Sequence, residues 1–351
     1  MKTQTTLSLA LPLLALPLLA FTGSADKVTF LPSEGTTVSK ELSLSATFYL
    51  DDMRMVVDGN EMPAEMMGGA MEEGLMIDMT VGVTDEYVKS EENKMLQLLR
   101  SFDELSMEAG PESQAENVDE FGELEDTTVS FTWDADSGEY VKAFHESEGE
   151  EDMLENLEAD MDFMALLPSG EVSEGDTWEA KGKDLGGIFL PGGVPGSASM
   201  DDAEAEEFEE LFKEEMEAQL ETAFEEFAIS CTYMGTKEEG EVAVGVIEFK
   251  FEGDMEVDLA ELIQQVIELQ AGEMDFSADI AAMVAAEFEG EGVLLWDMKG
   301  GHMHSFEMSG DLMVTADIEG DIDAMGEAHS VEMAVEASGE LSYSMESSKD
   351  E

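Results

Sequence analysis

The segment Thr36–Val57 reads TTVSKELSLSATFYLDDMRMVV and contains the pattern that decides the fold class. Over residues 42–48, apolar side chains alternate with serine and threonine at every second position. A period of two is typical of a strand that buries one face and exposes the other to water. The segment therefore predicts a long antiparallel strand, and similar patterns at residues 77–89, 242–256 and 280–345 predict a meander of such strands.

Helical periodicity interrupts the strands in three segments, 153–164, 200–227 and 259–269. The second is the clearest, because its apolar residues form one stripe along a helix of about 40 Å. The stripe consists of Phe208, Leu211, Phe212, Met216, Leu220, Ala223, Phe224 and Phe227. A stripe this broad needs an apolar partner, so we expect an α+β fold: a strongly curved, half-barrel-like antiparallel sheet with amphipathic helices packed on its concave face.

Two stretches share a Trp-Asp pair with a glycine five residues after the tryptophan, at Trp133 to Gly138 and at Trp296 to Gly301. Each lies between strand patterns and predicts a hairpin turn. This weak internal duplication suggests two related halves. The expected divisions are a signal peptide (1–25), an N-terminal α+β half (26–168), an extended segment with a Gly/Pro-rich connection (169–199), and a C-terminal α+β half (200–351).

The N-terminus is typical of a secretory signal peptide. Lys2 precedes a mostly apolar run at residues 7–21, and small residues follow the run before Asp26. Two prolines break the run, and it is too short for a transmembrane helix, which needs about 20 residues. We expect cleavage after Ala25, with Ala20 as the alternative, and a secreted or periplasmic protein without a transmembrane anchor.

The formal net charge of -70 restricts the partners of this chain. Its 85 Asp and Glu residues against 15 Lys and Arg residues repel nucleic acid and anionic bilayers, attract loosely associated cations and favour a monomer. Because the repulsion has to be screened, we expect a saline or divalent-rich medium. Cys231 is the single cysteine, so no internal disulfide can form, and its strand-like surroundings predict a buried, unreactive thiol.

The sequence contains none of the motifs GxSxG, HExxH and GxxxxGK. His302 and His304 are alternate residues of a predicted strand and would share one face, where two imidazoles could begin a copper or zinc site and Met308 could add a soft sulfur ligand. Exposed strand histidines without a metal are common, so both interpretations stay open.

Four acidic residues at alternate positions, Asp317, Glu319, Asp321 and Asp323, are similar to the start of a calcium loop. They lack the full loop spacing and its terminal Glu ligand, so the sequence favours weak cation association over a dedicated site. The eight methionines between residues 53 and 79 could form a soft-metal tract, but methionine also fills cores and lines apolar pockets, and we favour that role.

The chain also carries Glu34-Gly35-Thr36 before the first long strand, Leu166-Leu167-Pro168, Gly175-Asp176-Thr177-Trp178, and GEGVLLWDMKGG at residues 290–301. Together these motifs resemble those of uncharacterised secreted bacterial proteins of the planctomycete type. The resemblance covers most of the chain after residue 25. It implies a curved antiparallel sheet with helices inside, similar in general build to the periplasmic lipoprotein-carrier half-barrels, and it implies no catalytic residue.

The sequence therefore predicts a non-enzymatic exported protein that binds an apolar small molecule or lipid, or that serves a structural role in the cell envelope. Binding of a metal cation, copper or calcium, is the alternative, and a secreted hydrolase is the third hypothesis. No catalytic, cofactor-binding or metal-binding residue is assigned, and no cofactor is expected.

Overall fold

The computed structural model describes residues 25–62, 74–118, 124–147, 149, 151–181, 185–189, 191–193, 227–260, 263–264, 276–324 and 327–349. Of these residues, 70% lie in strands and 6% in helices or helical turns. The strand predicted at Thr36–Val57 is confirmed as β1, with the same bounds.

The other strands follow in chain order as β2 (Asn60–Glu61), β3 (Leu75–Glu91), β4 (Lys94–Pro111), β5 (Glu116–Asn117), β6 (Thr128–Asp134), β7 (Glu139–Phe144), β8 (Thr177–Lys181), β9 (Ala228–Glu239), β10 (Val242–Asp258), β11 (Phe276–Asp297), β12 (His302–Ala324) and β13 (Glu327–Lys349). The helical elements with defined bounds are the 3-10 turns η4 (Glu151–Leu154) and η5 (Met164–Leu166) and the one-turn helix α1 (Gly186–Phe189).

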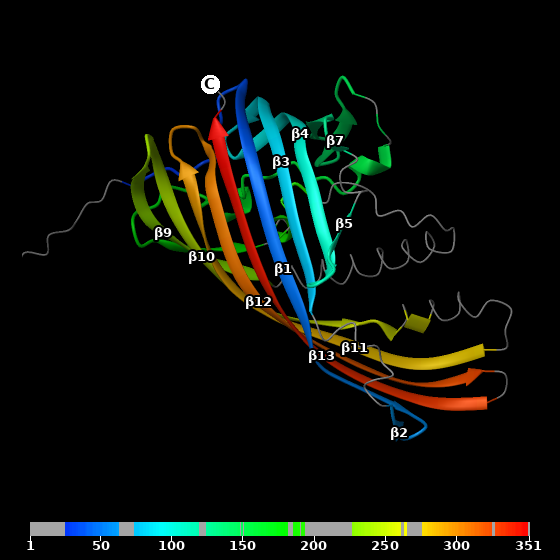
Figure 1. The fold of residues 1–351 in the computed structure, drawn as a ribbon. Coiled ribbons are helices and arrows are strands. Elements are labelled where there is room, and N and C mark those ends of the chain that lie inside the picture. Colours follow the sequence, from blue (N-terminus) through cyan, green and yellow to red (C-terminus); the bar gives the residue numbers. More distant parts are fainter. Residues whose placement is uncertain are drawn as a thin grey trace, which may run out of the picture.

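The thirteen described strands belong to one antiparallel sheet, in the order β7-β6-β4-β3-β1-β13-β12-β11-β10-β9-β8, with β2 paired to β1 and β5 paired to β4. The pairing of β1 with β13 joins the first and second halves of the chain, and it runs from Val38 opposite Lys349 to Val57 opposite Val331. In Figure 1 the blue β1 and the red β13 accordingly lie side by side near the middle of a strongly bent sheet.

The expected α+β architecture, with amphipathic helices packed on the sheet, is wrong for the described residues, which are nearly all antiparallel strand. The helix predicted at 153–164 is replaced by η4, an irregular stretch and η5. The carboxylate of Asp160 accepts the backbone N–H groups of Asp162 and Met164, and such local bonds compete with a helix. Phe163 has a left-handed backbone (φ 56), which also ends helical continuity.

The other two predicted helices fall largely outside the described residues. Of the segment 200–227 only Phe227 is described, and of the segment 259–269 only residues 259, 260, 263 and 264.

Both predicted hairpin turns are confirmed, between β6 and β7 and between β11 and β12. In each turn the aspartate carboxylate, of Asp134 or Asp297, accepts the backbone N–H two residues later. Gly138 and Gly301 donate their N–H groups to the carbonyl oxygens of these aspartates, at 2.9 Å in both cases. Both glycines have positive φ, which explains why the motif ends in glycine.

Residues 145–176, which we call the crossover segment, connect β7 at one end of the sheet to β8 at the other and cover one face of the sheet on the way (Figure 1, green). We call the covered face the inner face and the opposite one the outer face. The ring of Phe163 stacks on Phe306 of β12 with centroids 3.7 Å apart. The apolar residues that the crossover segment buries include Leu154, Leu157, Met161, Phe163 and Leu166.

The alternation predicted from the sequence assigns the residues of β1 to the two faces. Leu42 is buried on the inner face, whereas Ser43 is exposed on the outer face. The cross-strand register extends both sets, because Leu44 stands opposite Tyr343 and Ser43 stands opposite Ser344. The inner face is thus apolar and packed, and the outer face is polar.

The predicted signal peptide lies outside the described residues except for Ala25. Asp26, the next residue, forms a backbone bridge with Val172, with N···O distances of 2.7 and 2.9 Å. The Tyr233 hydroxyl donates to the Asp26 carboxylate at 2.9 Å. Within the described ranges, no helix combines the length and the apolar composition needed to cross a bilayer.

Candidate functional site

An apolar pocket of about 230 Å³ lies on the inner face, between α1 and the strands β1, β10, β11, β12 and β13. Its described lining consists of Phe48, Phe189, Phe251, Met255, Phe288, Gly310, Leu312, Gly339 and Leu341, and it is bordered by Glu289, Asp311 and Glu340. A dry cavity of about 150 Å³ is enough to bind benzene. The pocket can therefore hold a small apolar molecule or part of a longer apolar chain.

Aromatic rings over cross-strand glycines give this part of the inner face its shape. A Cβ atom at Gly339 would lie 2.7 Å from the ring of Phe48, and one at Gly253 would lie 2.6 Å from the ring of Phe288. The missing β-carbons let the rings approach the backbone of the neighbouring strand. The rings consequently lie close to the sheet and leave space for the pocket above them.

Phe189 closes one side of the pocket from α1. Its ring meets that of Phe251 edge-on, with centroids 5.5 Å apart, and that of Phe227 at 6.0 Å. Aromatic pairs at these separations contribute about 0.5–1.5 kcal/mol beyond the area that they bury. The contacts hold α1 against β10 and so define the pocket wall.

Farther along the inner face, a buried charge cluster fixes the crossover segment to the sheet. Its members are Lys40 of β1, Asp85 and Tyr87 of β3, Arg100 of β4 and Asp162 of the crossover segment. The Lys40 ammonium lies 3.0 Å from a carboxylate oxygen of both Asp85 and Asp162. Arg100 donates to the two carboxylate oxygens of Asp85 at 2.7 and 3.0 Å, and the Tyr87 hydroxyl donates to Asp162 at 2.7 Å.

The backbone of the crossover segment takes part in the same network. Arg100 donates to the carbonyl oxygens of Glu158 and Ala159 at 2.9 and 3.0 Å. Asp162 in turn accepts the N–H of Met303 on β12 at 3.1 Å. These bonds tie one stretch of the crossover segment to strands from both halves of the chain, so the cluster positions this cover over the sheet.

In the buried charge cluster, ion pairing affects the pKa values of Asp85 and Lys40 more strongly than burial does. Burial acts to raise the pKa of Asp85, but the charges of Arg100 and Lys40 overcome it and hold that pKa below its usual value. Burial likewise acts to lower the pKa of Lys40, yet Asp162 and Asp85 raise it. Asp85 and Lys40 are therefore held in their charged forms.

Asp160 is a surplus carboxylate beside this balanced cluster. Burial raises its pKa to about 6, and the charge of Asp162 acts in the same direction.

The hydroxyl of Tyr343 is buried and has no hydrogen-bond partner among the described residues. Burial and the charge of Asp160 raise the pKa of Tyr343 well above its usual value, so its phenol stays neutral.

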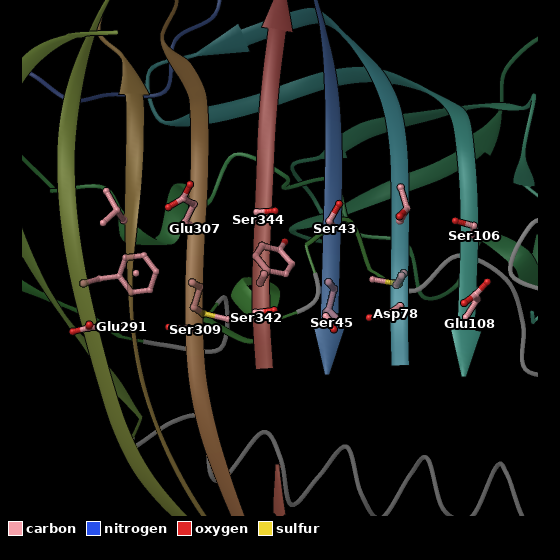
Figure 2. Close-up of a pocket in the computed structure, with 18 of the residues that line it drawn as sticks. Ser43, Ser45, Asp78, Ser106, Glu108, Glu291, Glu307, Ser309, Ser342 and Ser344 are labelled. Atoms are coloured by element: carbon pink, nitrogen blue, oxygen red, sulfur yellow. The ribbon is translucent and has the colours of Figure 1, made fainter. Parts of the chain in front are cut away.

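The outer face carries a larger, polar groove of about 970 Å³ that reaches across the sheet from β10 to β4. Figure 2 shows its serine hydroxyls on the central strands and its carboxylates toward both sides. The labelled residues are Ser43, Ser45, Asp78, Ser106, Glu108, Glu291, Glu307, Ser309, Ser342 and Ser344. The described lining holds no histidine or cysteine, so it offers hydrogen bonds and negative charge rather than an activated nucleophile.

Beside the groove, four carboxylates on adjacent strands stand directly opposite one another on the outer face. This acidic row consists of Glu252, Glu289, Asp311 and Glu340. Like charges that face each other across strands destabilise a sheet. Three of the four, Glu289, Asp311 and Glu340, lie on the same strands as the floor of the apolar pocket, but their side chains point to the opposite face of the sheet.

The face that the sequence predicts His302 and His304 to share is not formed. A register shift between Leu295 and Trp296 places Met303 opposite Trp296 and leaves His304 without an opposite residue, which breaks the alternation that the prediction assumed. His302 is 4% exposed and stacks on Tyr87 in the core. Across the described ranges, no group of three or more His, Cys, Asp or Glu residues is arranged to hold a metal ion.

The structure places the four acidic residues of the calcium-loop hypothesis in a strand rather than in a loop. Asp317, Glu319, Asp321 and Asp323 all lie in β12, which is extended throughout. Alternate strand residues are about 6.8 Å apart, so carboxylates on one straight strand do not converge on a single ion. Glu319 moreover stands opposite a second acid, Glu332 of β13.

The buried charge cluster was not predicted from the sequence, although the sequence contains a signal for it. Lys40 occupies the buried face of β1 between Val38 and Leu42, and Asp85 lies between the buried residues Val83 and Tyr87 of β3. A charged residue at a buried-face position requires a partner, because an unpaired buried charge is costly. The partner on the crossover segment could not be identified, because that segment has no periodicity that fixes its path.

Comparisons with known proteins give no family for this chain. No protein-family model matches the sequence, and no curated protein does. Weakly similar solved structures include one described as "Asymmetric conductivity of engineered proteins" (8% identity, 89% of this chain and 100% of the other, TM-score 0.16). Two others are OccK8 (OprE) of Pseudomonas aeruginosa (6% identity, 90% and 98%, TM-score 0.14) and a loop-deletion mutant of OmpT, an outer membrane protein of Vibrio cholerae (9% identity, 90% and 100%, TM-score 0.10). TM-scores this low carry no argument about fold or function.

Proposed function

We propose that this chain is an exported, non-enzymatic protein that binds an apolar ligand in the pocket of the inner face. The observation that carries the proposal is the composition of the pocket: four phenylalanines, one methionine, two leucines and two glycines surround about 230 Å³, and the neighbouring acids of the same strands point to the opposite face of the sheet. Binding pockets for small molecules are mainly apolar concavities of this kind.

One further observation supports the proposal. The polar groups of the buried charge cluster are occupied with one another at short distances, which leaves them no role in chemistry on a substrate. A purely structural role in the envelope needs no pocket, so ligand binding is the more specific hypothesis.

Calorimetric titration with decanol tests the proposal. Leu312→Trp would fill the pocket, whereas Met313→Trp changes the next residue of β12, which is 54% exposed on the outer face. We expect saturable binding to the wild type and to Met313→Trp and at least about ten-fold weaker binding to Leu312→Trp, since about 1.4 kcal/mol of lost contact is a factor of ten. Absence of saturable binding to the wild type, or equal binding to both variants, would contradict the proposal.

A further inference from the structure

We propose that the buried charge cluster sets the affinity of the apolar pocket for its ligand, through a backbone contact that positions Phe189. This inference rests on the proposed function and adds positioning residues to it. The residues concerned, Arg100, Gly192 and Gly193, all lie outside the described lining of the pocket. Their effect on binding therefore passes through the pocket wall.

The wall that α1 contributes is too short to hold its own position. α1 is a single turn, Gly186–Phe189, and isolated helices of fewer than about 12 residues are marginal in water. Leu185 and Ile188 are buried in the core and anchor the turn from below. Phe189 is its last residue and contacts Phe251 with centroids 5.5 Å apart. The position of this ring consequently also depends on what holds the chain after α1.

The chain after α1 is bonded to the crossover segment. The Glu158 N–H donates to the carbonyl oxygen of Gly192 at 2.8 Å, and the Gly192 N–H donates to the carbonyl oxygen of Asp160 at 3.1 Å. Leu157 and Gly193 form an isolated antiparallel bridge. We call these contacts, between residues 157–160 and residues 192–193, the backbone clamp. The clamp fixes the chain just beyond the pocket wall.

The two glycines of the backbone clamp allow a close approach of the two segments. Gly193 has φ 76, and a Cβ atom there would overlap the carbonyl oxygen of Asn156. Gly192 has φ 78, and a Cβ atom there would lie 2.8 Å from the sulfur of Met161. Gly192 is three residues after Phe189, and three residues span at most about 11 Å, so a displacement of the clamp reaches the ring of the pocket wall.

The buried charge cluster holds the other side of the backbone clamp. Arg100 donates to the carbonyl oxygens of Glu158 and Ala159 at 2.9 and 3.0 Å, and two bonds to Asp85 fix its guanidinium. A Cβ atom at Gly192 would lie 3.3 Å from Nη1 of Arg100, so the guanidinium also packs against the clamp. Glu158 is thus bound to the cluster through its carbonyl oxygen and to Gly192 through its N–H, which connects the cluster to the chain that carries the pocket wall.

Calorimetric titration of variants with decanol tests this connection. Gly193→Ala places a methyl group against the Asn156 carbonyl and displaces the clamp, so we expect decanol to bind at least about five-fold more weakly than to the wild type. Arg100→Lys keeps the charge but loses the planar fork that reaches both carbonyl oxygens, and we expect a loss in the same direction. Two controls should keep the wild-type affinity. Gly170→Ala adds a methyl group to the crossover segment in open space, and Val244→Ala opens a cavity in the buried part of β10 outside the pocket lining.

Hydrogen exchange in the wild type supplies a test that needs no substitution. Coupling between two sites is reciprocal, so a clamp that sets the affinity for decanol must be stabilised by decanol to a similar degree. We expect saturating decanol to slow the exchange of the Glu158 and Gly192 N–H groups at least about five-fold. The Gly138 N–H, in the turn between β6 and β7, should exchange at an unchanged rate. A contact that served the fold alone would not respond to the ligand.

Three results would overturn the inference and leave the proposed function standing. They are wild-type affinity in both Gly193→Ala and Arg100→Lys, an equal loss of affinity in Val244→Ala, and clamp N–H groups that exchange at the same rate with and without decanol. If the wild type shows no saturable decanol binding that Leu312→Trp removes, the proposed function fails and the inference fails with it.

Discussion

The two faces of the sheet carry charged residues under opposite conditions. On the inner face, Asp85 contacts both Lys40 and Arg100, and Asp162 contacts Lys40, at distances of 2.7 to 3.0 Å. On the outer face, the acidic row sets four carboxylates on adjacent strands opposite one another. The same residue types are thus paired where water is excluded and left facing like charges where water surrounds them.

Solvent accounts for this difference. A charge inside the protein loses its hydration and interacts strongly with its neighbours, so it is tolerated only with a partner in good geometry. At the surface, water and salt weaken the repulsion between carboxylates, and the Debye length is about 10 Å at 0.1 M salt. The chain can therefore carry a net charge of -70, provided that the negative surplus lies on the solvated face.

The largest effect is expected from removing a carboxylate of the inner face. Asp85→Ala leaves Arg100 without a carboxylate partner and Lys40 with Asp162 alone. Breaking a buried ion pair from one side costs about 3–5 kcal/mol, because the remaining charge stays buried and uncompensated. We expect the free energy of unfolding, measured by urea titration at constant salt, to fall by that amount. The matched control is Glu340→Ala on the outer face, for which we expect less than about 0.5 kcal/mol; similar losses for the two variants would remove the contrast between the faces.

The second effect is expected from adding a β-carbon at a glycine of the packed inner face, which changes packing rather than charge. A Cβ atom at Gly292 would overlap both the ring of Phe249 and the carbonyl oxygen of Glu307, whereas one at Gly170 would meet nothing within 4 Å. We expect Gly292→Ala to lower the free energy of unfolding by about 1–3 kcal/mol, because the packed inner face must shift to accept a methyl group. Gly170→Ala should change it by less than about 0.5 kcal/mol. If urea titration gave the same stability for both variants, the aromatic-over-glycine packing of the inner face would be wrong.

The sequence was sufficient to predict the first long strand, β1, and which face its residues 42–48 occupy. The alternation around Leu42 is a local property of the chain, and the cross-strand register carries it through the sheet. The pairing of β1 with β13 was not predictable, because its partners lie some 300 residues apart (Val38 opposite Lys349) and no local signal links them. The helix expected at 153–164 was wrong because the apolar spacing there serves burial in an irregular segment, which Asp160 stabilises by accepting backbone N–H groups.

The sequence could predict that an apolar pocket exists, but it could not predict which residues line it. An apolar pocket follows from the abundance of phenylalanine and methionine, but its lining combines residues from five strands and α1, which only the sheet order brings together. The methionines between residues 53 and 79 contribute none of the lining that the structure describes, where Met255 is the methionine present. The shared face predicted for His302 and His304 is interrupted by a single bulge at His304, which sequence periodicity cannot reveal.

The third prediction is that the pH dependence of the unfolding free energy differs between a buried acid, Asp160, and an exposed acid of the outer face. The pKa of Asp160 is raised to about 6 by burial, so the folded protein holds this proton more tightly than the unfolded chain does. Its contribution to stability is therefore greatest below about pH 4 and is lost as the pH rises through about 6, by about 1–3 kcal/mol. We expect the difference in unfolding free energy between wild type and Asp160→Asn to change over this range and to be flat above it. The same series on Glu307→Gln, an exposed outer-face acid, is the control; a pH dependence of equal size in both variants would contradict the assignment to Asp160.

The smallest expected effect is a gain in stability when one carboxylate of the acidic row on the outer face is neutralised. Asp311 has an acid directly opposite on each side, Glu289 and Glu340, whereas Glu307 stands opposite Val293 and Ser344. Asp311→Asn removes two facing like-charge pairs, and we expect it to raise the free energy of unfolding by about 0.5–1 kcal/mol at about 0.1 M salt. The gain should disappear at about 1 M salt, where the Debye length is about 3 Å. Glu307→Gln removes the same charge without a facing acid, so its gain should be smaller at low salt. Equal gains for the two variants would mean that the outer face responds to total charge alone, and that the register of the acidic row has no energetic consequence of its own.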